Sequence, residues 1–164
     1  MATLITLSGD NGPLTDIDVP LGRHEIKRRW MYAGKEFMEW LLNEVPNLKP
    51  GRLGAADTPS EQLDQILHRW IAGKNIKYNR MFKDLMPTAD EVWEMKTVDI
   101  RIFGWMCAPR TFIAVLGGYA DGFKLRGSDR AYDYAKKKVI KFRDGLNLDE
   151  PKIAKGVFDA LVSI

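Results

Sequence analysis

The spacing of apolar residues changes near Gly73, and this change divides the sequence into a helical part and a sheet-forming part. Before this glycine, apolar residues recur three and four positions apart over residues 23–44 and 58–73, which is the spacing of amphipathic helices. Thr58, followed three residues later by a glutamate, is typical of a capping box at a helix start. Residues 2–8 are typical of a short strand, so the pattern predicts one strand followed by a helical hairpin.

After this glycine, the apolar and polar residues alternate with a period of two. The alternation predicts strands at residues 92–97 and 99–106, and the apolar run at 111–119 is typical of a central strand buried on both faces. Residues 107–110 form a link of hairpin length, and residues 75–82 could be a further strand or a turn. The sequence therefore predicts an antiparallel meander of three to four strands.

The chain ends in further helical patterns. A cap at Ser128 or Asp129 begins a third helix that runs to Asp144, and residues 151–164 suggest a short terminal helix. The expected fold class is α+β, with one or two C-terminal helices after the sheet. We expect a single domain with three consecutive parts: 1–75 (strand plus helical hairpin), 76–145 (sheet and helix) and 146–164 (C-terminal extension), together 1–164.

Composition narrows the class of protein only modestly. With one cysteine, Cys107, and two histidines in 164 residues, the chain can form neither an internal disulfide nor a cysteine-rich zinc site. The first residues lack the basic region of a signal peptide, and the longest uncharged apolar run, 111–120, is about half of a membrane span. We therefore expect a cytoplasmic protein with no membrane partner.

The net charge of +3 conceals a strong local excess of positive charge. Residues 124–143 contain eight Lys or Arg against two Asp, a local excess of +6. Such a run is often a solvated helix face, but it can also be the electrostatic footprint of a phosphate-backbone partner. The neighbouring strands can bring Lys83, Lys96 and Arg101 to the same side. Arg101 lies between large apolar residues of a predicted strand, where a guanidinium needs a partner or a ligand.

Five segments in this order carry a resemblance to a known family: FKDL (82–85), VWEMK (92–96), DIRIFGW (99–105), TFIAVLGGYADGFK (111–124) and AYDYAKKKVIKFRDGL (131–146). The stretch of residues 76–144 resembles the RelE/HigB superfamily of toxin–antitoxin toxins, in particular its phage-derived HigB-like branch. The order of a strand and two helices before the meander is also similar to that family.

The resemblance implies an RNA endonuclease that cuts messenger RNA, usually on the ribosome, without a metal or other cofactor. In this reaction a 2′-hydroxyl attacks the adjacent phosphodiester, which requires a base, an acid and cationic groups for the phosphate. By position, Arg101 is the candidate phosphate clamp, Lys96 stands where the family usually has arginine, and Lys83 is a supporting cation. The resemblance also implies an antitoxin that covers the basic face. The candidate RNA-binding residues are Lys124, Arg126, Arg130, Lys137 and Lys141.

The sequence departs from the family near its end. Many members carry a late Tyr or His that assists acid–base chemistry, and residues 149–164 contain neither. Tyr119 and Tyr132 are the nearest hydroxyls, although packing roles are favoured for both, and His24 and His68 lie outside the sheet. An alternative function is therefore a non-catalytic phage or mobile-element protein on the same scaffold, which binds nucleic acid or inhibits a host protein. A third interpretation is an unrelated α+β domain.

Overall fold

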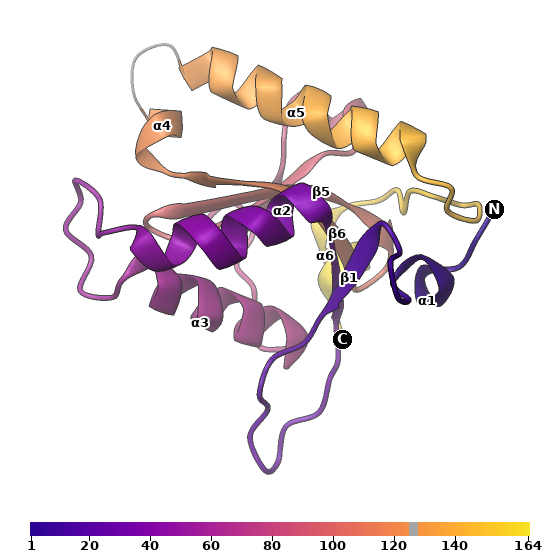
Figure 1. Ribbon diagram of the computed structural model, residues 1–164, viewed down its shortest axis with the longest axis horizontal. Coiled ribbons are helices and arrows are strands. Elements are labelled where there is room, and N and C mark those ends of the chain that lie inside the picture. Colours follow the sequence, from indigo (N-terminus) through magenta and orange to yellow (C-terminus); the bar gives the residue numbers. More distant parts are fainter. Residues whose placement is uncertain (125–127) are drawn as a thin grey trace.

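A computed structural model describes residues 1–124 and 128–164 and has an α+β fold built on one mixed sheet, which confirms the predicted fold class (Figure 1). The strand order is β1-β2-β6-β5-β4-β3; β2 and β6 pair in parallel and the other neighbours are antiparallel. The six strands are β1 (Leu14–Ile17), β2 (Trp30–Gly34), β3 (Phe82–Asp84), β4 (Trp93–Lys96), β5 (Ile100–Ala108) and β6 (Thr111–Tyr119).

Helices cover both faces of this sheet, with α2 and α3 on one side and α5 on the other (Figure 1). In the described part of the chain, no helix is both long and apolar enough to cross a membrane. The helical elements are α1 (Leu4–Leu7), α2 (Lys35–Glu39), the π turn η1 (Trp40–Glu44), the 3-10 turn η2 (Val45–Asn47), α3 (Pro59–Ile71), the 3-10 turn η3 (Thr88–Asp90), α4 (Asp121–Lys124), α5 (Ser128–Gly145) and α6 (Phe158–Val162).

The sheet separates two hydrophobic clusters, because successive side chains of a strand point to opposite faces. On β5, Ile102 packs with the α3 side, whereas Phe103 and Trp105 pack with the α5 side. All three side chains are fully buried. This alternation is the one expected from the sequence of residues 99–106, and it fixes which polar side chains of β4 and β5 face α5.

The later part of the chain follows the sequence pattern closely. Thr58 and Glu61 form the expected capping box at the start of α3, with Thr58 Oγ1 accepting from the Glu61 amide at 3.2 Å. Strands β3 to β6 pair antiparallel with their sequence neighbours, as expected for a meander. The sheet nevertheless has six strands rather than the predicted three to four, because β1 and β2 extend it beyond β6.

Two predictions for the first part of the chain were wrong. Residues 2–8 contain the helical turn α1 instead of a strand, and Thr3 caps it by accepting from the Thr6 amide at 3.2 Å. Residues 23–44 do not form one helix, because β2 occupies their middle and helical structure begins only at Lys35. Tertiary pairing with β6 prevails over the helical spacing of the apolar side chains.

The C-terminal extension is helical over a shorter length than predicted and packs along the sheet. Residues before α6 contact β5, where the Ala154 amide donates to the Met106 carbonyl at 2.8 Å and Trp105 Nε1 donates to the Lys152 carbonyl at 2.8 Å. In the turn between β5 and β6, the Arg110 amide donates to the Leu161 carbonyl at 2.7 Å. The extension thus covers part of β5.

Candidate functional site

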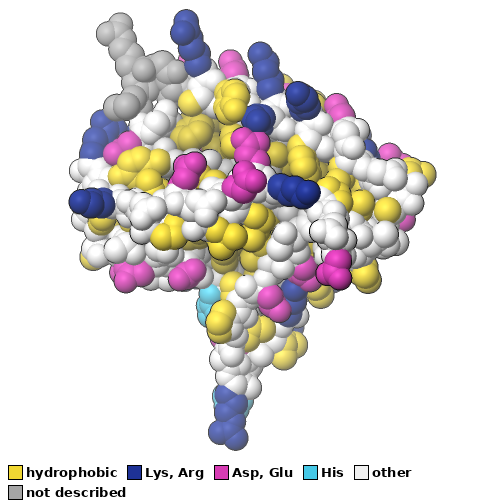
Figure 2. Space-filling model, in the orientation of Figure 1, with side chains coloured by type: hydrophobic (Ala, Val, Ile, Leu, Met, Phe, Trp, Pro, Cys, Tyr) yellow, Lys and Arg dark blue, Asp and Glu magenta, His cyan; other side chains and the backbone are white. Residues whose placement is uncertain are grey.

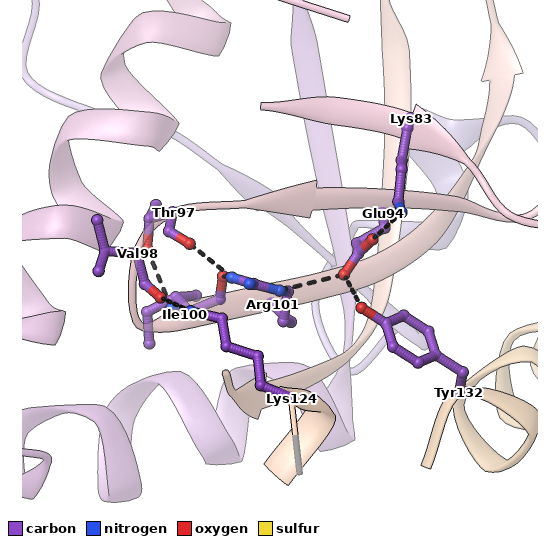
Figure 3. A network of polar contacts seen from close by, with 8 residues as sticks. All are labelled: Lys83, Glu94, Thr97, Val98, Ile100, Arg101, Lys124 and Tyr132. Carbon is purple, nitrogen blue, oxygen red and sulfur yellow. Dashed lines mark hydrogen bonds and ion pairs between the residues drawn. The ribbon is translucent and has the colours of Figure 1, made fainter. Parts of the chain in front are cut away.

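A buried carboxylate on β4 lies at the centre of a polar network on the α5 side of the sheet (Figure 3). Glu94 is 0% exposed, and its Oε1 lies 3.2 Å from Nε of Arg101 and accepts a hydrogen bond from the Tyr132 hydroxyl at 2.9 Å. Nζ of Lys83 lies 3.7 Å from the other oxygen, Oε2. We call Lys83, Glu94, Arg101 and Tyr132 the Glu94 network.

Strand register explains why these side chains meet. Lys83 lies opposite Glu94 across β3 and β4, and Lys96 lies opposite Arg101 across β4 and β5. Because every second residue shares a face, Lys83, Lys96 and Arg101 all lie on the Glu94 side of the sheet. Lys124 on α4 reaches the β4–β5 turn, where its Nζ donates to the Val98 carbonyl at 3.2 Å (Figure 3).

Arg101 has the partner that its position in an apolar strand required. Its side chain is 8% exposed, pairs with Glu94 and donates through Nη1 to the carbonyls of Thr97 and Ile100 (Figure 3). Nη2 takes part in none of these contacts. The Glu94 oxygen that faces Lys83, Oε2, is buried without a hydrogen bond, so Lys83 compensates its charge only through space. Arg101 is therefore held rigidly and exposes little surface to a ligand.

Lys96 lies among other cations on this face. It is partly exposed, and burial, followed by repulsion from Lys83, lowers its pKa. Arg101 and Lys124 lower it further, whereas Glu94 acts in the opposite direction. Lys96 and its three neighbouring cations thus share the one carboxylate of the Glu94 network. A bound anion would relieve this repulsion, and a phosphate group fits the requirement.

A second buried polar cluster holds the β4–β5 turn in place. Gln62 on α3 donates to Asp99 Oδ2 at 2.8 Å, and its Oε1 accepts from the Thr97 hydroxyl at 2.8 Å and the Asp99 amide at 2.9 Å. Asp99 Oδ1 also accepts from the Gly51 amide at 3.1 Å. Because Thr97 and Val98 belong to this turn, the cluster fixes the carbonyls that Arg101 and Lys124 contact.

The basic residues of α5 are separated from the Glu94 network. Arg130, Lys137 and Lys141 are exposed, whereas Ala135 and Val139 are buried against the sheet. Lys137 and Lys141 each follow a buried residue by two positions, which turns them to the outer side of the helix. Lys137 and Lys141 therefore lie on the solvent side of α5, away from the face that carries Lys96. Arg126, another predicted RNA-binding residue, lies outside the described residues.

Sequence reasoning missed the central role of Glu94 and the contact made by Tyr132. The signal for Glu94 was available, since the alternation of residues 92–97 places it on the same face as Arg101. Tyr132 was expected to pack on other side chains, and it also bonds Glu94. Tyr119 bonds the Lys49 carbonyl at 3.0 Å instead, and His68 lies 2.8 Å from Glu25, away from the network.

Comparisons with protein-family models, with curated proteins and with solved structures give no match for this chain. Among residues 1–124 and 128–164, no group of three or more His, Cys, Asp or Glu side chains is placed to hold a metal ion.

The Tyr132 hydroxyl should make the free energy of unfolding change with pH in the alkaline range. Burial, followed by the charge of Glu94 and the hydrogen bond to it, raises the pKa of Tyr132 from 10.0 to about 12. The folded protein binds this proton more tightly than the unfolded chain, so its stabilising contribution is complete below about pH 10 and is lost towards pH 12. We expect Tyr132→Phe to flatten the fall in the free energy of unfolding over this range.

Urea unfolding at several pH values measures this effect. Tyr134→Phe is the matched control, because Tyr134 is 56% exposed on the same helix, and it should leave the pH dependence unchanged. An equally steep fall in Tyr132→Phe and in the original protein would contradict the role given to this hydroxyl.

Proposed function

We propose that this chain is a RelE/HigB-like toxin that cuts messenger RNA on the ribosome without a metal. The observation that carries the proposal is the group of four cations on one face of the meander, Lys83, Lys96, Arg101 and Lys124, around the single carboxylate of the Glu94 network. A cytoplasmic site of action and an antitoxin that covers this face belong to the same proposal.

The order of elements supports the proposal. From β2 onwards, the chain runs through one strand, a short helix with its π turn, the helix α3, the antiparallel strands β3 to β6 and the helix α5. This is the order of a strand, two helices, a meander and a final helix that the family resemblance implies. The strand at the start of that order is β2, and not residues 2–8.

The accessible lysines are proposed as the phosphate contacts. Lys83, Lys96 and Lys124 retain partial exposure, whereas Arg101 is fixed by Glu94 and two carbonyls. Cations held in place before the reaction can stabilise the charge that develops on a phosphate without further reorganisation. In this proposal Arg101 positions the face, because Glu94 and two carbonyls hold it in place. In the same proposal the Tyr132 hydroxyl, which donates to Glu94 at 2.9 Å, is the proton donor.

Cleavage of messenger RNA in a translation extract tests the proposal. The purified protein is added to extracts with and without ribosomes in the presence of a metal chelator, and RNA ends are mapped. We expect ribosome-dependent cuts within the coding region, and induced expression in bacteria should arrest growth. Intact RNA under all conditions, together with normal growth, would reject the enzymatic proposal.

A non-catalytic binding protein on the same scaffold is the second candidate, and the burial of the Glu94 network favours it. Glu94 is 0% exposed, and the Tyr132 hydroxyl is engaged with it, so the two groups suited to proton transfer are occupied with each other. This candidate predicts binding to nucleic acid or to a host protein without turnover. Steep loss of affinity with added salt would indicate a nucleic acid.

A further inference from the structure

A long arm between β1 and β2, residues 18–29, projects from the body of the protein (Figure 1). Arg23 and His24, in the middle of the arm, are both exposed. The space-filling view shows the colour of Lys or Arg at the tip of the arm (Figure 2). Arg28, nearer the body, is exposed as well. The arm therefore presents positive charge at a distance from the Glu94 network.

Contacts with α3 hold the base of the arm in a defined position. Glu25 lies 2.8 Å from Nε2 of His68 and 2.9 Å from Nζ of Lys74, and its Oε1 accepts from the Gly22 amide at 2.8 Å. Arg29 is 3% exposed and donates to the carbonyls of Val162, Trp70 and Lys74. An arm fixed in this way can hold its cations in place for a partner.

A groove of about 700 Å³ lies beside α3, on the side of the sheet opposite the Glu94 network. It lies between α3, the loop at residues 55–57 and the β4–β5 turn, and Lys96 lines it together with Arg69 and Lys74. Lys74 is also the residue that holds Glu25 of the arm. Lys74 thus joins the groove to the arm. Lys96 borders the groove at the end of β4, although its side chain lies on the Glu94 side of the sheet.

The lining of the groove combines cations with apolar and amide groups. Ile66, Met81 and Val98 supply apolar surface, Gln65 supplies an amide, and Asp57 is the carboxylate in the lining. Asp57 is engaged with Gln65, whose Nε2 donates to it at 3.1 Å. Grooves that bind single-stranded nucleic acid combine cations for the phosphates with aromatic side chains on which the bases stack. This groove supplies the cations, and its apolar side chains are aliphatic.

Arg28 lies between the cations of the groove and the arm, and the aliphatic part of its side chain fixes its position. It packs against Gly73, where an added Cβ would lie 2.7 Å from Cβ of Arg28, so only glycine permits this approach. The Arg28 amide donates to the Ile71 carbonyl at 2.8 Å. Arg28 therefore lies beside the end of α3, next to the residue pair Gly73 and Lys74 that leads into the groove.

We propose that the groove and the arm form an extended single-stranded RNA path, in which the strand passes from the Glu94 network round the end of β4 at Lys96 and its phosphates reach Arg28 and Arg23. The inference deepens the proposed function and rests on it for the identity of the polyanion. It assigns to the arm a contribution to affinity and substrate length, separate from any chemical step at the network.

The salt dependence of RNA binding tests this path. Affinities of the original protein and of Arg23→Ala/Arg28→Ala are measured by fluorescence anisotropy for single-stranded RNAs of about 4 and about 16 nucleotides. Each lost phosphate contact should lower the slope of log affinity against log salt by about 0.7, hence by about 1.4 for the pair. We expect this change for the long RNA only, with at least about a tenfold loss of affinity at low salt.

Lys35→Ala/Lys155→Ala is the matched control, because both lysines are exposed and lie outside the groove and the arm. An unchanged slope and affinity in the arm variant, while the original protein binds and cuts RNA, would overturn the path alone. Arm-dependent binding of the long RNA without any cleavage would reject the endonuclease and retain the path. Binding of an acidic protein, but of no RNA, through the arm would also overturn it.

Discussion

Replacement of Glu94 by leucine is expected to lower the free energy of unfolding by about 3–5 kcal/mol, which is the typical cost of removing one partner of a buried ion pair. The substitution nearly preserves volume, so the loss comes from charge and hydrogen bonding rather than from a cavity. It leaves the Arg101 guanidinium, with an 8% exposed side chain, without its carboxylate, and leaves the Tyr132 hydroxyl without an acceptor. Urea denaturation at neutral pH measures the change.

Two further variants test whether the loss of stability comes from the broken ion pair or whether any substitution in β4 would destabilise the protein. Glu94→Leu combined with Arg101→Met removes both charges and should recover most of the lost stability, since apolar replacement of a buried pair is often neutral or favourable. Glu39→Ala, a substitution at an exposed glutamate, should change stability by less than about 0.5 kcal/mol. A loss below about 1 kcal/mol for Glu94→Leu, or no recovery in the double variant, would contradict the account.

Replacement of Lys96 by methionine is expected to reduce RNA cleavage by about 10²–10³-fold, the usual effect of removing one preorganised charge-stabilising group. The same substitution should leave the stability unchanged or raise it. Burial and the neighbouring cations disfavour the charged form of Lys96 in the folded protein, and methionine keeps an apolar stem there without the charge. A gain in stability with a loss of activity is typical of a residue retained for function.

Single-turnover cleavage assays and thermal unfolding measure the two effects on the same preparations. Lys35→Met, at an exposed position on α2, is the matched control and should retain full cleavage. Full cleavage activity in Lys96→Met would show that this lysine does not contact the phosphate. A marked loss of stability would instead show that Lys96 has a structural partner, contrary to the repulsion described above.

The candidate site could be predicted from the sequence only in part. The period of two on β4 and β5 correctly placed Lys96 and Arg101 on one face, because a buried sheet fixes the strand register. The engagement of Arg101 by Glu94 depends on side-chain geometry across two strands, which the alternation does not specify. The approach of Tyr132 depends further on where α5 packs, and that is decided by the apolar contacts of Ala135 and Val139.

The fold was least predictable where local and long-range preferences compete. The apolar residues of 23–44 recur at helical spacing, but Met31 and Ala33 are fully buried in a strand beside β6. That pairing joins residues about 80 positions apart, so no short window of sequence indicates it. For α3, by contrast, the cap, the apolar stripe and the terminal glycine all favour the same helix, and the structure agrees.

The chemistry of the RNA ends tests the central claim most directly. If a 2′-hydroxyl attacks the adjacent phosphodiester, the upstream fragment ends in a cyclic 2′,3′-phosphate and the downstream fragment begins with a 5′-hydroxyl. The account predicts these ends in the presence of a metal chelator, and no cut where the 2′-hydroxyl is replaced by hydrogen. Products with a 5′-phosphate, cleavage of the deoxy-substituted site or complete absence of cleavage would contradict it.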